Sequence, residues 1–496
     1  MSTPSSPVPG TPASPSLVVS SPADILSYIP HALGFLPTES LVVLTTAGRK
    51  LGATLRVDLP DAGADPLGFA HGVLSFLQGD LDADGTLVVV YTEEPWGRGA
   101  PAPHSGTVLT LEDVLDTAGL PVRGGWLVSR SAWRDFFCLE EECCPWPGHP
   151  LDTVAHSALN AELIFGGSAF DASAPDAVLR TAPSVAARAD ARTAVPDAAI
   201  RAVETAQAHY AACCAGRWTT PHQFRATSAL WDAVLHRVGE FDAEAEPDVA
   251  GFLLASVEAR AVRDFLLVSA CLGSAAAVDG ATGCGLLAPG PRADTPSTPD
   301  EDPAAAGVLP EARSSGPLHD AVAAIRAAGA PAEVDAGLDP EAGAGIDADP
   351  GPGGRPEPGP ESEAGSDARY PGPRTAGPAS CGVEALRYAD VLAGRHPGAI
   401  AWDRVDAMSI LLAQLAAVSD GESRAATLTM SAWFEYARGR GSRAAVFLDA
   451  AERSVPGYRL ARLLHELLRR GGLPVWARSR ATAWTEGAAA ALRDAA

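Results

Sequence analysis

A short stretch in the first third of the chain concentrates side chains that bind metal ions. Cysteines and histidines follow the pattern Cys-x4-Cys-Cys-x4-His-x6-His, at Cys138, Cys143, Cys144, His149 and His156. Thiolates and imidazoles are zinc ligands, and a structural zinc site is closed by four of them. The pattern lacks a Cys-x2-Cys pair and contains two adjacent cysteines, so thiols packed beneath a proline-rich loop are the favoured alternative. The sequence predicts no cofactor, and structural zinc at this loop is the one alternative.

A second set of candidate residues, for binding a small ligand, comprises His31, Glu39, Ser40, Arg56 and Asp58. His31, Ser40 and Glu39 have the residue types of a serine–histidine–acid constellation, in which the histidine must reach the serine. No Gly-x-Ser-x-Gly elbow accompanies them. We therefore favour a structural interpretation, a helix and turn that place the apolar residues after His31 in the core.

Two arginine–aspartate pairs raise the same question of structure or ligand binding. Arg56 and Asp58 are alternate residues of an expected strand, so their side chains point to one face. Arg263 and Asp264 are neighbours on an expected helix. Because buried charges in proteins usually neutralise one another, a structural ion pair is the favoured interpretation for both and a ligand anchor the alternative.

Residues 17–175 alternate the patterns of strands and helices. Two β-branched runs at 40–45 and 53–59, separated by a turn at 47–49, predict a hairpin. Further along we expect a helix at 65–78, a strand at 87–92, a helix from Thr110 to Gly119 and a strand at 124–133. Elements mixed in this order predict an α/β domain with a mixed sheet.

Residues 176–288 and 381–496 show helical periodicity. Helices are expected at 197–214, 221–240, 247–272, 402–418, 422–438, 442–454, 458–470 and 482–494. Ala432, Ala444, Ala451 and Pro456, around a turn at 439–441, have the spacing of one tetratricopeptide repeat. One repeat cannot bury its apolar face alone, so the neighbouring helices must complete the stack.

Two segments have the composition of disordered chain. Residues 1–16 are mostly serine, proline and threonine. Residues 289–380 contain 17 Pro and 14 Gly, with 16 acidic and 6 basic residues, so they have too little apolar surface to offset chain entropy. One amphipathic stretch inside this acidic insertion, 318–328, predicts a transient helix.

The charge balance and the apolar runs exclude several classes of protein. With 37 basic and 61 acidic residues the net charge is −24, which argues against binding nucleic acid or an anionic membrane. No apolar run is long enough for a transmembrane helix. The N-terminus lacks the basic residues of a secretory signal, so we expect a cytoplasmic protein with reduced cysteines.

Longer segments carry a family resemblance. ADILSYIPHALGFLPTESLVVL at 23–44, followed by LGATLRVDLP, resembles the opening of an actinobacterial family known as domain of unknown function 4192. CLEEECCPWPGHPL at 138–151, AELIFGG at 161–167, ARAVRDFLLV at 259–268 and the helices at 433–468 are similar to later segments of that family. The resemblance implies no activity, and it implies one helical unit interrupted by residues 289–380.

Two functional hypotheses follow. The first is a non-enzymatic interaction or regulatory protein, whose α/β domain binds a ligand or partner and whose helical region binds a protein. Exposed arginines would favour an acidic peptide, including the chain's own insertion: Arg438, Arg440, Arg443, Arg469 and Arg470. The second is a metal-dependent hydrolase that uses the loop 138–156. We expect a protein partner, and no nucleic acid or membrane.

Overall fold

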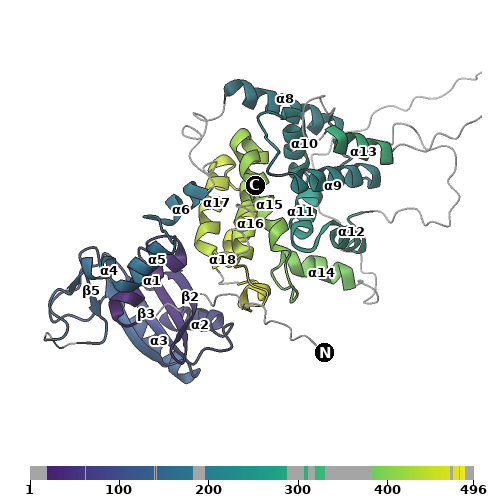
Figure 1. Ribbon diagram of the computed structural model, residues 1–496. Helices are drawn as coiled ribbons and strands as arrows, with labels where there is room; N and C mark the ends of the chain where they lie inside the picture. Colours follow the sequence, from purple (N-terminus) through teal and green to yellow (C-terminus); the bar gives the residue numbers. More distant parts are fainter. Residues whose placement is uncertain are drawn as a thin grey trace, which may run out of the picture.

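The chain folds into an N-terminal α/β domain followed by a larger helical region (Figure 1). The computed structural model describes residues 19–61, 63–138, 140, 142–181, 196–287, 307–310, 319–329, 383–469, 473–479 and 481–485. The expected tail at 1–16 and most of the acidic insertion lie outside these residues. The predicted fold class, a mixed α/β domain followed by an all-helical region, is confirmed.

One mixed sheet forms the centre of the α/β domain, with the strand order β2-β1-β3-β4-β5-β6. Its strands are β1 (Ser40–Ala47), β2 (Lys50–Asp58), β3 (Gly85–Tyr91), β4 (Val122–Val128), β5 (Ala132–Asp135) and β6 (His149–Pro150). β3 and β4 run parallel, and the other neighbouring strands run antiparallel. β1 and β2 form the predicted hairpin, with Gly48 at φ +59° in its turn.

Helices cover both faces of this sheet, which explains why β3 is buried along its whole length and β1 at every residue but the last. On one face, α2 (Pro66–Leu77) and α3 (Ser105–Thr117) pack against side chains such as Val43 and Val88. On the other face, α1 (Pro22–Leu33) packs against Val42 and Val89, and α4 (Asp152–Ala155) and α5 (Ala158–Phe165) lie beside α1. Alternate strand residues therefore serve two separate cores.

Two predicted elements of this domain are wrong in detail. Helix α3 begins at Ser105 rather than near Thr110, whose hydroxyl donates to the carbonyl of Gly106 inside the helix. The strand expected at 124–133 is two strands, β4 and β5. Between them Ser129 and Ala132 exchange hydrogen bonds through the Ser129 hydroxyl and backbone, so the chain reverses there.

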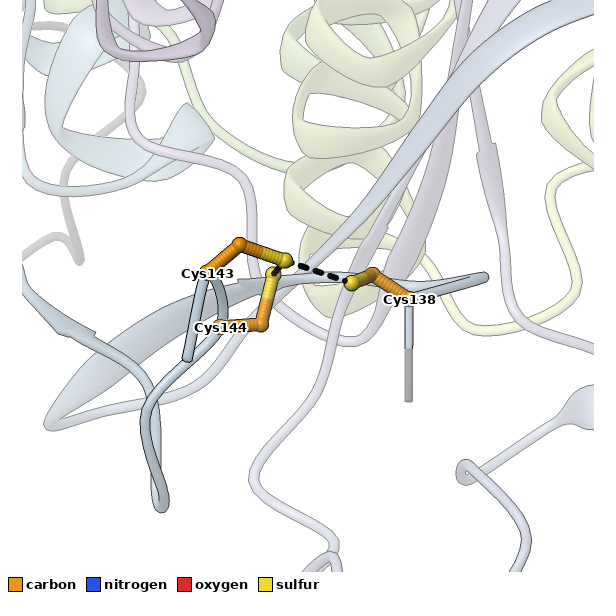
Figure 2. A group of neighbouring side chains, drawn as sticks. All are labelled: Cys138, Cys143 and Cys144. Carbon is orange, nitrogen blue, oxygen red and sulfur yellow. Dashed lines mark hydrogen bonds between the residues drawn. The ribbon is translucent and has the colours of Figure 1, made fainter. Parts of the chain in front are cut away.

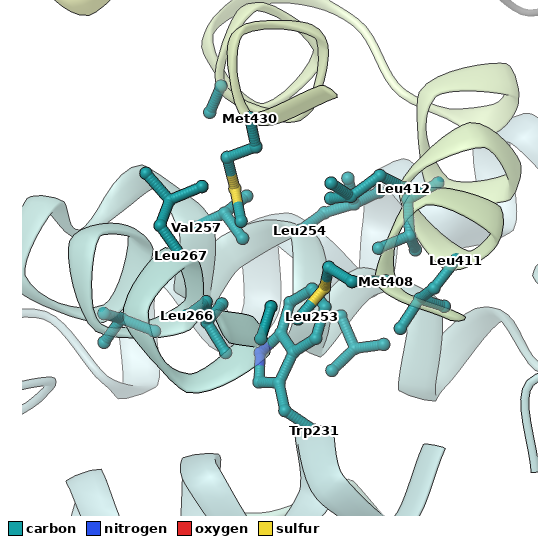
Figure 3. Close-up of a cluster of buried hydrophobic side chains, with 14 of the residues drawn as sticks. Trp231, Leu253, Leu254, Val257, Leu266, Leu267, Met408, Leu411, Leu412 and Met430 are labelled. Atoms are coloured by element: carbon teal, nitrogen blue, oxygen red, sulfur yellow. The ribbon is translucent and has the colours of Figure 1, made fainter. Parts of the chain in front are cut away.

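The helical region is built around one apolar core to which distant parts of the chain contribute. Its helices are α6 (Ala174–Thr181), α8 (Asp197–Cys213), α9 (Pro221–His236), α10 (Pro247–Glu258), α11 (Arg260–Leu272), α12 (Ser274–Gly283), α13 (His319–Gly329), α14 (Val383–Leu392), α15 (Trp402–Val418), α16 (Gly421–Ala437), α17 (Gly441–Ser454) and α18 (Arg459–Arg469), followed by the 3-10 turn η3 (Val475–Arg478). Figure 3 shows Trp231 and Leu253 packed beside Met408, and Met430 beside Val257. Helices on both sides of the acidic insertion thus form one unit.

The single helix predicted at 247–272 is two helices. Ala259 has an extended backbone with ψ 112°, and its carbonyl accepts the amide of Arg263 at the start of α11. Helix α10 crosses α8 very closely at Gly251, where a Cβ atom would lie 2.6 Å from the Cβ atom of Ala206 and 2.6 Å from the amide nitrogen of Gln207. Only glycine fits this crossing without a shift of the backbone.

Part of the acidic insertion is ordered and packed. The side-chain amide of Gln223 in α9 donates to the carbonyl of Val308 and accepts from its amide, and Leu309 is buried. Helix α13 follows, with Val322 buried against the helical core. The amphipathic stretch predicted at 318–328 is therefore a packed helix, because the apolar face of α9 covers it. The expectation of disorder does not hold for 307–310 and 319–329.

The helix pair predicted near residue 440 is present as α16 and α17. Ala432, Ala444 and Ala451 are fully buried between neighbouring helices, and Gly439 takes φ +76° at the turn. Its relation to tetratricopeptide repeats stays a prediction. Of the helix expected at 482–494, residues 482–485 are described and are not helical, and the rest lies outside the described residues.

Among the helices of the described residues, none combines the length and apolarity needed to cross a bilayer.

Candidate functional site

Three of the predicted metal ligands converge on the loop between β5 and β6. The Sγ atoms of Cys138 and Cys143 are 3.0 Å apart, and those of Cys143 and Cys144 are 3.8 Å apart. All three sulfur atoms lie within 4.8 Å of one another. Figure 2 shows the three thiol groups pointing toward a common point. Adjacent cysteines, which count against a metal site by spacing alone, here turn their side chains the same way.

The guanidinium group of Arg134 hydrogen-bonds to the backbone of this loop. Arg134 is only 4% exposed, and its Nη1 atom donates to the carbonyls of Cys144 at 2.6 Å and Pro145 at 3.1 Å. The guanidinium carbon lies 5.5 Å from the centre of the Trp96 ring and 5.3 Å from that of Trp146, within the range of cation–π attraction. The cation therefore fixes the path of the backbone that carries the thiols.

Two further contacts turn the chain after β5 toward the cluster. One carboxylate oxygen of Asp135 accepts the amides of Phe137 and Cys138, both at 2.9 Å, which makes a local side-chain turn. The thiol of Cys143 lies 3.6 Å from the carbonyl oxygen of Glu140. Contacts between residues close in the chain thus bring the thiols together. The cluster could therefore be predicted from the sequence.

The three thiols differ in acidity. The hydrogen bond from Cys143 lowers the pKa of Cys138, with help from the backbone at Glu140. The same hydrogen bond raises the pKa of Cys143, because its proton is the one shared. Burial raises the pKa of Cys144 to about 12. Cys138 is therefore the most acidic thiol of the cluster, and a metal ion would have to displace the protons of the thiols that it binds.

The two histidines predicted as further ligands do not join the cluster. The ring of His149 stacks on Trp133 with ring centres 4.5 Å apart. The Nδ1 atom of His156 lies 2.8 Å from the carbonyl oxygen of Asp152, one turn earlier in the chain. The predicted set of cysteines and histidines is therefore corrected to three thiols. The hydrolase hypothesis, which needs an open metal position or an acid–base pair at this loop, gains no support from the two histidines and stays a prediction.

The second candidate set is divided between three places. Arg56 pairs with Asp58 at 2.6 Å, donates to Ser40 at 2.8 Å and reaches Ser442 of α17 at 3.4 Å. This arrangement is the structural pair favoured from the sequence, and it links the two regions. Arg263 likewise pairs with Asp264 at 2.9 Å.

Glu39 makes contacts of its own. Its backbone takes φ +42°, and its carboxylate accepts the amide of Glu93 at 2.6 Å and the hydroxyl of Thr92. It therefore ties the start of β1 to the end of β3, and it does not face His31 or Ser40.

His31 has other partners than those considered from the sequence. Its Nδ1 atom lies 2.9 Å from the hydroxyl of Ser168, and its Nε2 atom lies 2.9 Å from Oδ1 of Asn160. Sequence reasoning missed Ser168 and Asn160, which are 137 and 129 residues away in the chain. The available signal was indirect: Asn160 and Ser168 directly flank the segment AELIFGG, at 161–167.

Two of the five arginines expected to present a basic surface are internal. Arg438 is 5% exposed in its side chain and pairs with Glu435 and Asp406, and Arg443 is buried against the other oxygen of Glu435. Arg440 lies 4.1 Å from the ring centre of Trp484. Arg469 is exposed, and Arg470 lies outside the described residues. The expected acidic-peptide surface is therefore wrong for Arg438 and Arg443, because Glu435 neutralises them.

Comparison with protein families identifies a match over most of the chain. A family model described as "Domain of unknown function (DUF4192)" matches residues 22–281 and 361–475, which include the cysteine loop, His31 and most of the helical core. No curated protein and no solved structure matches the chain.

Proposed function

Since the chain belongs to the DUF4192 family, whose description names no activity, we propose a function from geometry: a regulatory protein whose α/β domain binds a thiophilic metal ion, zinc in the first place. The observation that carries this proposal is the convergence of Cys138, Cys143 and Cys144, whose sulfur atoms lie within 4.8 Å of one another. Thiolate sulfur is a soft ligand that selects zinc or copper(I) over calcium and magnesium.

The distances fit a tetrahedral ion with small adjustments. A Zn–S bond of about 2.3 Å and tetrahedral angles place two sulfur ligands about 3.8 Å apart. Cys143 and Cys144 already have that separation, at 3.8 Å. Cys138 and Cys143, at 3.0 Å, would move apart by less than about 1 Å, and Cys143 is an exposed side chain on a loop.

Arg134 supports the same assignment. Three thiolates and one Zn²⁺ carry a net charge of −1, and a buried guanidinium hydrogen-bonded to the carbonyls of that loop offsets it. The Nε atom of Arg134 is buried and has no hydrogen-bond partner among the described residues. A buried cation incompletely paired by the protein is better explained beside an anionic centre than beside neutral thiols.

We propose that the partner of this regulatory site is a protein. The strong negative charge supports a protein rather than a nucleic acid. Phe137, which directly precedes Cys138, is 39% exposed, so a change at the thiols is transmitted to a surface aromatic residue one position away. Aromatic side chains at such positions are frequent anchors of protein interfaces.

The test is metal content. Full-length protein, purified without an affinity tag under reducing conditions, is analysed for metals and titrated with Co²⁺, whose thiolate complexes absorb in the near ultraviolet. We expect about one metal ion per chain, lost in a Cys143→Ala, Cys144→Ala double variant.

The matched control is Cys213→Ala, which removes an exposed cysteine at the end of α8 and leaves the loop intact. It should keep the metal and the cobalt absorption. If the wild-type protein takes up neither zinc nor cobalt, or if the double variant keeps either, the proposed function is wrong.

A further inference from the structure

His31, Ser168 and Asn160 form a second constellation in the α/β domain, independent of the thiols. The Ser168 hydroxyl and the Asn160 carbonyl oxygen each lie 2.9 Å from a different nitrogen of the His31 ring. We propose that these residues form an acyl-transfer site in which Ser168 is the nucleophile, His31 its general base and Asn160 the positioning residue. The expected substrates are esters or thioesters of an uncharged, apolar acyl group.

The hydrogen bonds fix the form of His31 that this chemistry requires. The side-chain amide nitrogen of Asn160 donates to the carbonyl of Ala155 at 2.7 Å, so its oxygen is the atom that faces His31. That oxygen can only accept, and the proton of the neutral ring is therefore on Nε2. Nδ1 is left with a lone pair directed at the Ser168 hydroxyl. Nucleophilic enzymes orient their base in this way, with asparagine as the third group in some of them.

The ends of two helices hold the constellation in place. Helix α5 ends in a Schellman motif: Gly167 takes φ +85° and donates to the carbonyl of Ile164, and Ser168 donates to that of Leu163. Ser168 therefore stands at a defined position just beyond the helix. His31 lies in the last turn of α1, which runs beside α5 (Figure 1).

A backbone amide next to Ser168 is available to stabilise the oxyanion. The backbone N–H of Ala169, directly after Ser168, donates to no acceptor among the described residues. The amide after the nucleophile is the one that stabilises the oxyanion in serine hydrolases. It is therefore our candidate for that contact.

Exposed apolar side chains lie on both sides of Ser168 in the chain. Phe165 is 95% exposed, Ile164 and Phe170 are also exposed, and the Phe170 ring centre lies 4.9 Å from that of His31. Exposed apolar side chains gathered at one place favour an apolar ligand. This surface indicates the acyl class and argues against a charged substrate.

The reaction balances without a cofactor. Ser168 Oγ attacks the carbonyl carbon as its proton passes to Nδ1 of His31, and the bond to the leaving oxygen or sulfur breaks as that atom takes the proton from His31. The acyl group is then an ester of Ser168. Water attacks this ester, gives a proton to His31, and the proton returns to Ser168 Oγ as the acid leaves.

The first test is covalent labelling. Full-length protein is treated with a fluorophosphonate, and the adduct is located by intact mass and peptide mapping. We expect one adduct on Ser168, none in Ser168→Ala, and unchanged labelling in the matched control Ser75→Ala, an exposed serine whose hydroxyl bonds only to the carbonyl of Gly72. Absence of an adduct from wild-type protein, or an equal adduct in Ser168→Ala, overturns the proposal.

The second test is hydrolysis of 4-nitrophenyl acetate and butyrate. Ser168→Ala should reduce the rate to background and His31→Ala should lower it about 10²–10⁴-fold, the usual contribution of a general base. Asn160→Ala should lower kcat, whereas Asn160→Asp, which keeps the acceptor for His31, should restore part of it. Equal rates in wild type and His31→Ala, with unchanged circular dichroism melting, overturn the role of the base.

One further variant distinguishes the activity of Ser168 from any activity of the thiols at the proposed metal site. Thiols also react with nitrophenyl esters, so all assays are repeated in a Cys138→Ser, Cys143→Ser, Cys144→Ser background with a chelator present. Activity that survives there and depends on Ser168 supports the acyl site whatever the outcome for the metal. Activity that disappears there belongs to the thiols and overturns it.

Discussion

In the α/β domain three thiols lie together on a partly exposed loop, whereas in the helical region one carboxylate, Glu435, lies buried between arginines. Arg438 and Arg443 contact its two oxygens at 3.1 and 3.0 Å, and Arg440 is 4.0 Å away. The charges of the buried cluster around Glu435 neutralise one another, because each has a neighbour of opposite sign. The thiols have mainly one another as partners, and the proposed metal ion would supply the positive charge that this group lacks. Charge balance therefore distinguishes a structural cluster from a candidate site.

The strongest challenge to this comparison is Glu435→Ala. It removes the carboxylate shared by Arg438 and Arg443 and leaves Asp406 as the acidic partner of Arg438, so we expect the free energy of unfolding to fall by about 3–5 kcal/mol in urea denaturation. The thiol loop should keep its metal, because it lies in the other region. A loss below about 1 kcal/mol, the range of an exposed pair, would show that the cluster is not structural.

The pKa of Glu435 gives a second test of whether this buried cluster is structural. Burial raises the pKa of Glu435, but Arg438, Arg443 and Arg440 outweigh that effect and hold it below the ordinary value. The stability contributed by a carboxylate with a lowered pKa is complete above its unfolded pKa, about 4.3, and is lost as the pH falls through its folded pKa. Urea denaturation of wild type and Glu435→Gln should therefore differ most near neutral pH and converge in acid. A difference that does not change with pH contradicts the assignment.

Arg134→Ala tests the other half of the comparison. Removing the guanidinium that supports the thiol loop should weaken zinc binding about 10–100-fold, as for other residues behind a metal ligand. Competition with a chromophoric chelator measures this. Arg130→Ala is the control, because Arg130 pairs with Glu93 in solvent beyond the loop and should leave the affinity unchanged. Equal affinities in all three proteins would remove Arg134 from the site.

The smallest effect is expected for Glu466→Ala. Glu466 and Arg469 form an exposed pair on α18, with side chains 41% and 78% exposed, so solvent already screens them. We expect a change of at most about 1 kcal/mol in the free energy of unfolding, smaller in high salt. A larger loss would mean that α18 depends on this pair, and exposure would then be a poor guide to structural charges here.

Local patterns were enough for much of the fold and for half of the site. The β-branched run at 40–45 predicts β1, and the spacing of Cys138, Cys143 and Cys144 predicts a cluster because a short loop brings neighbours together. The pairing of Arg438 with Glu435 was also local, at a spacing of three residues on one helix, and the arginines were nevertheless expected to be exposed.

Contacts between distant segments could not be predicted in this way. His31 meets Asn160 and Ser168 only because α1 and α5 lie side by side on the sheet, and no periodicity encodes that neighbourhood. The packing of α13 depends likewise on the surface of α9, on the other side of a long stretch of chain. The hydrogen-bond partners of a single histidine cannot be predicted from the sequence when they lie far away in the chain.

The contact between α12 and α14 has a consequence for the evolution and engineering of the chain. A Cβ atom at Gly283 would lie 3.2 Å from that of Ala385, and the Cys284 thiol lies 3.6 Å from the Ala385 carbonyl oxygen. Helices on the two sides of the acidic insertion thus meet directly, while 307–310 and α13 pack on α9 between them in the chain. Because each doubling of a closed loop costs only about 0.6 kcal/mol, we expect the insertion outside these packed segments to tolerate changes in length, so that a reporter domain could be grafted there.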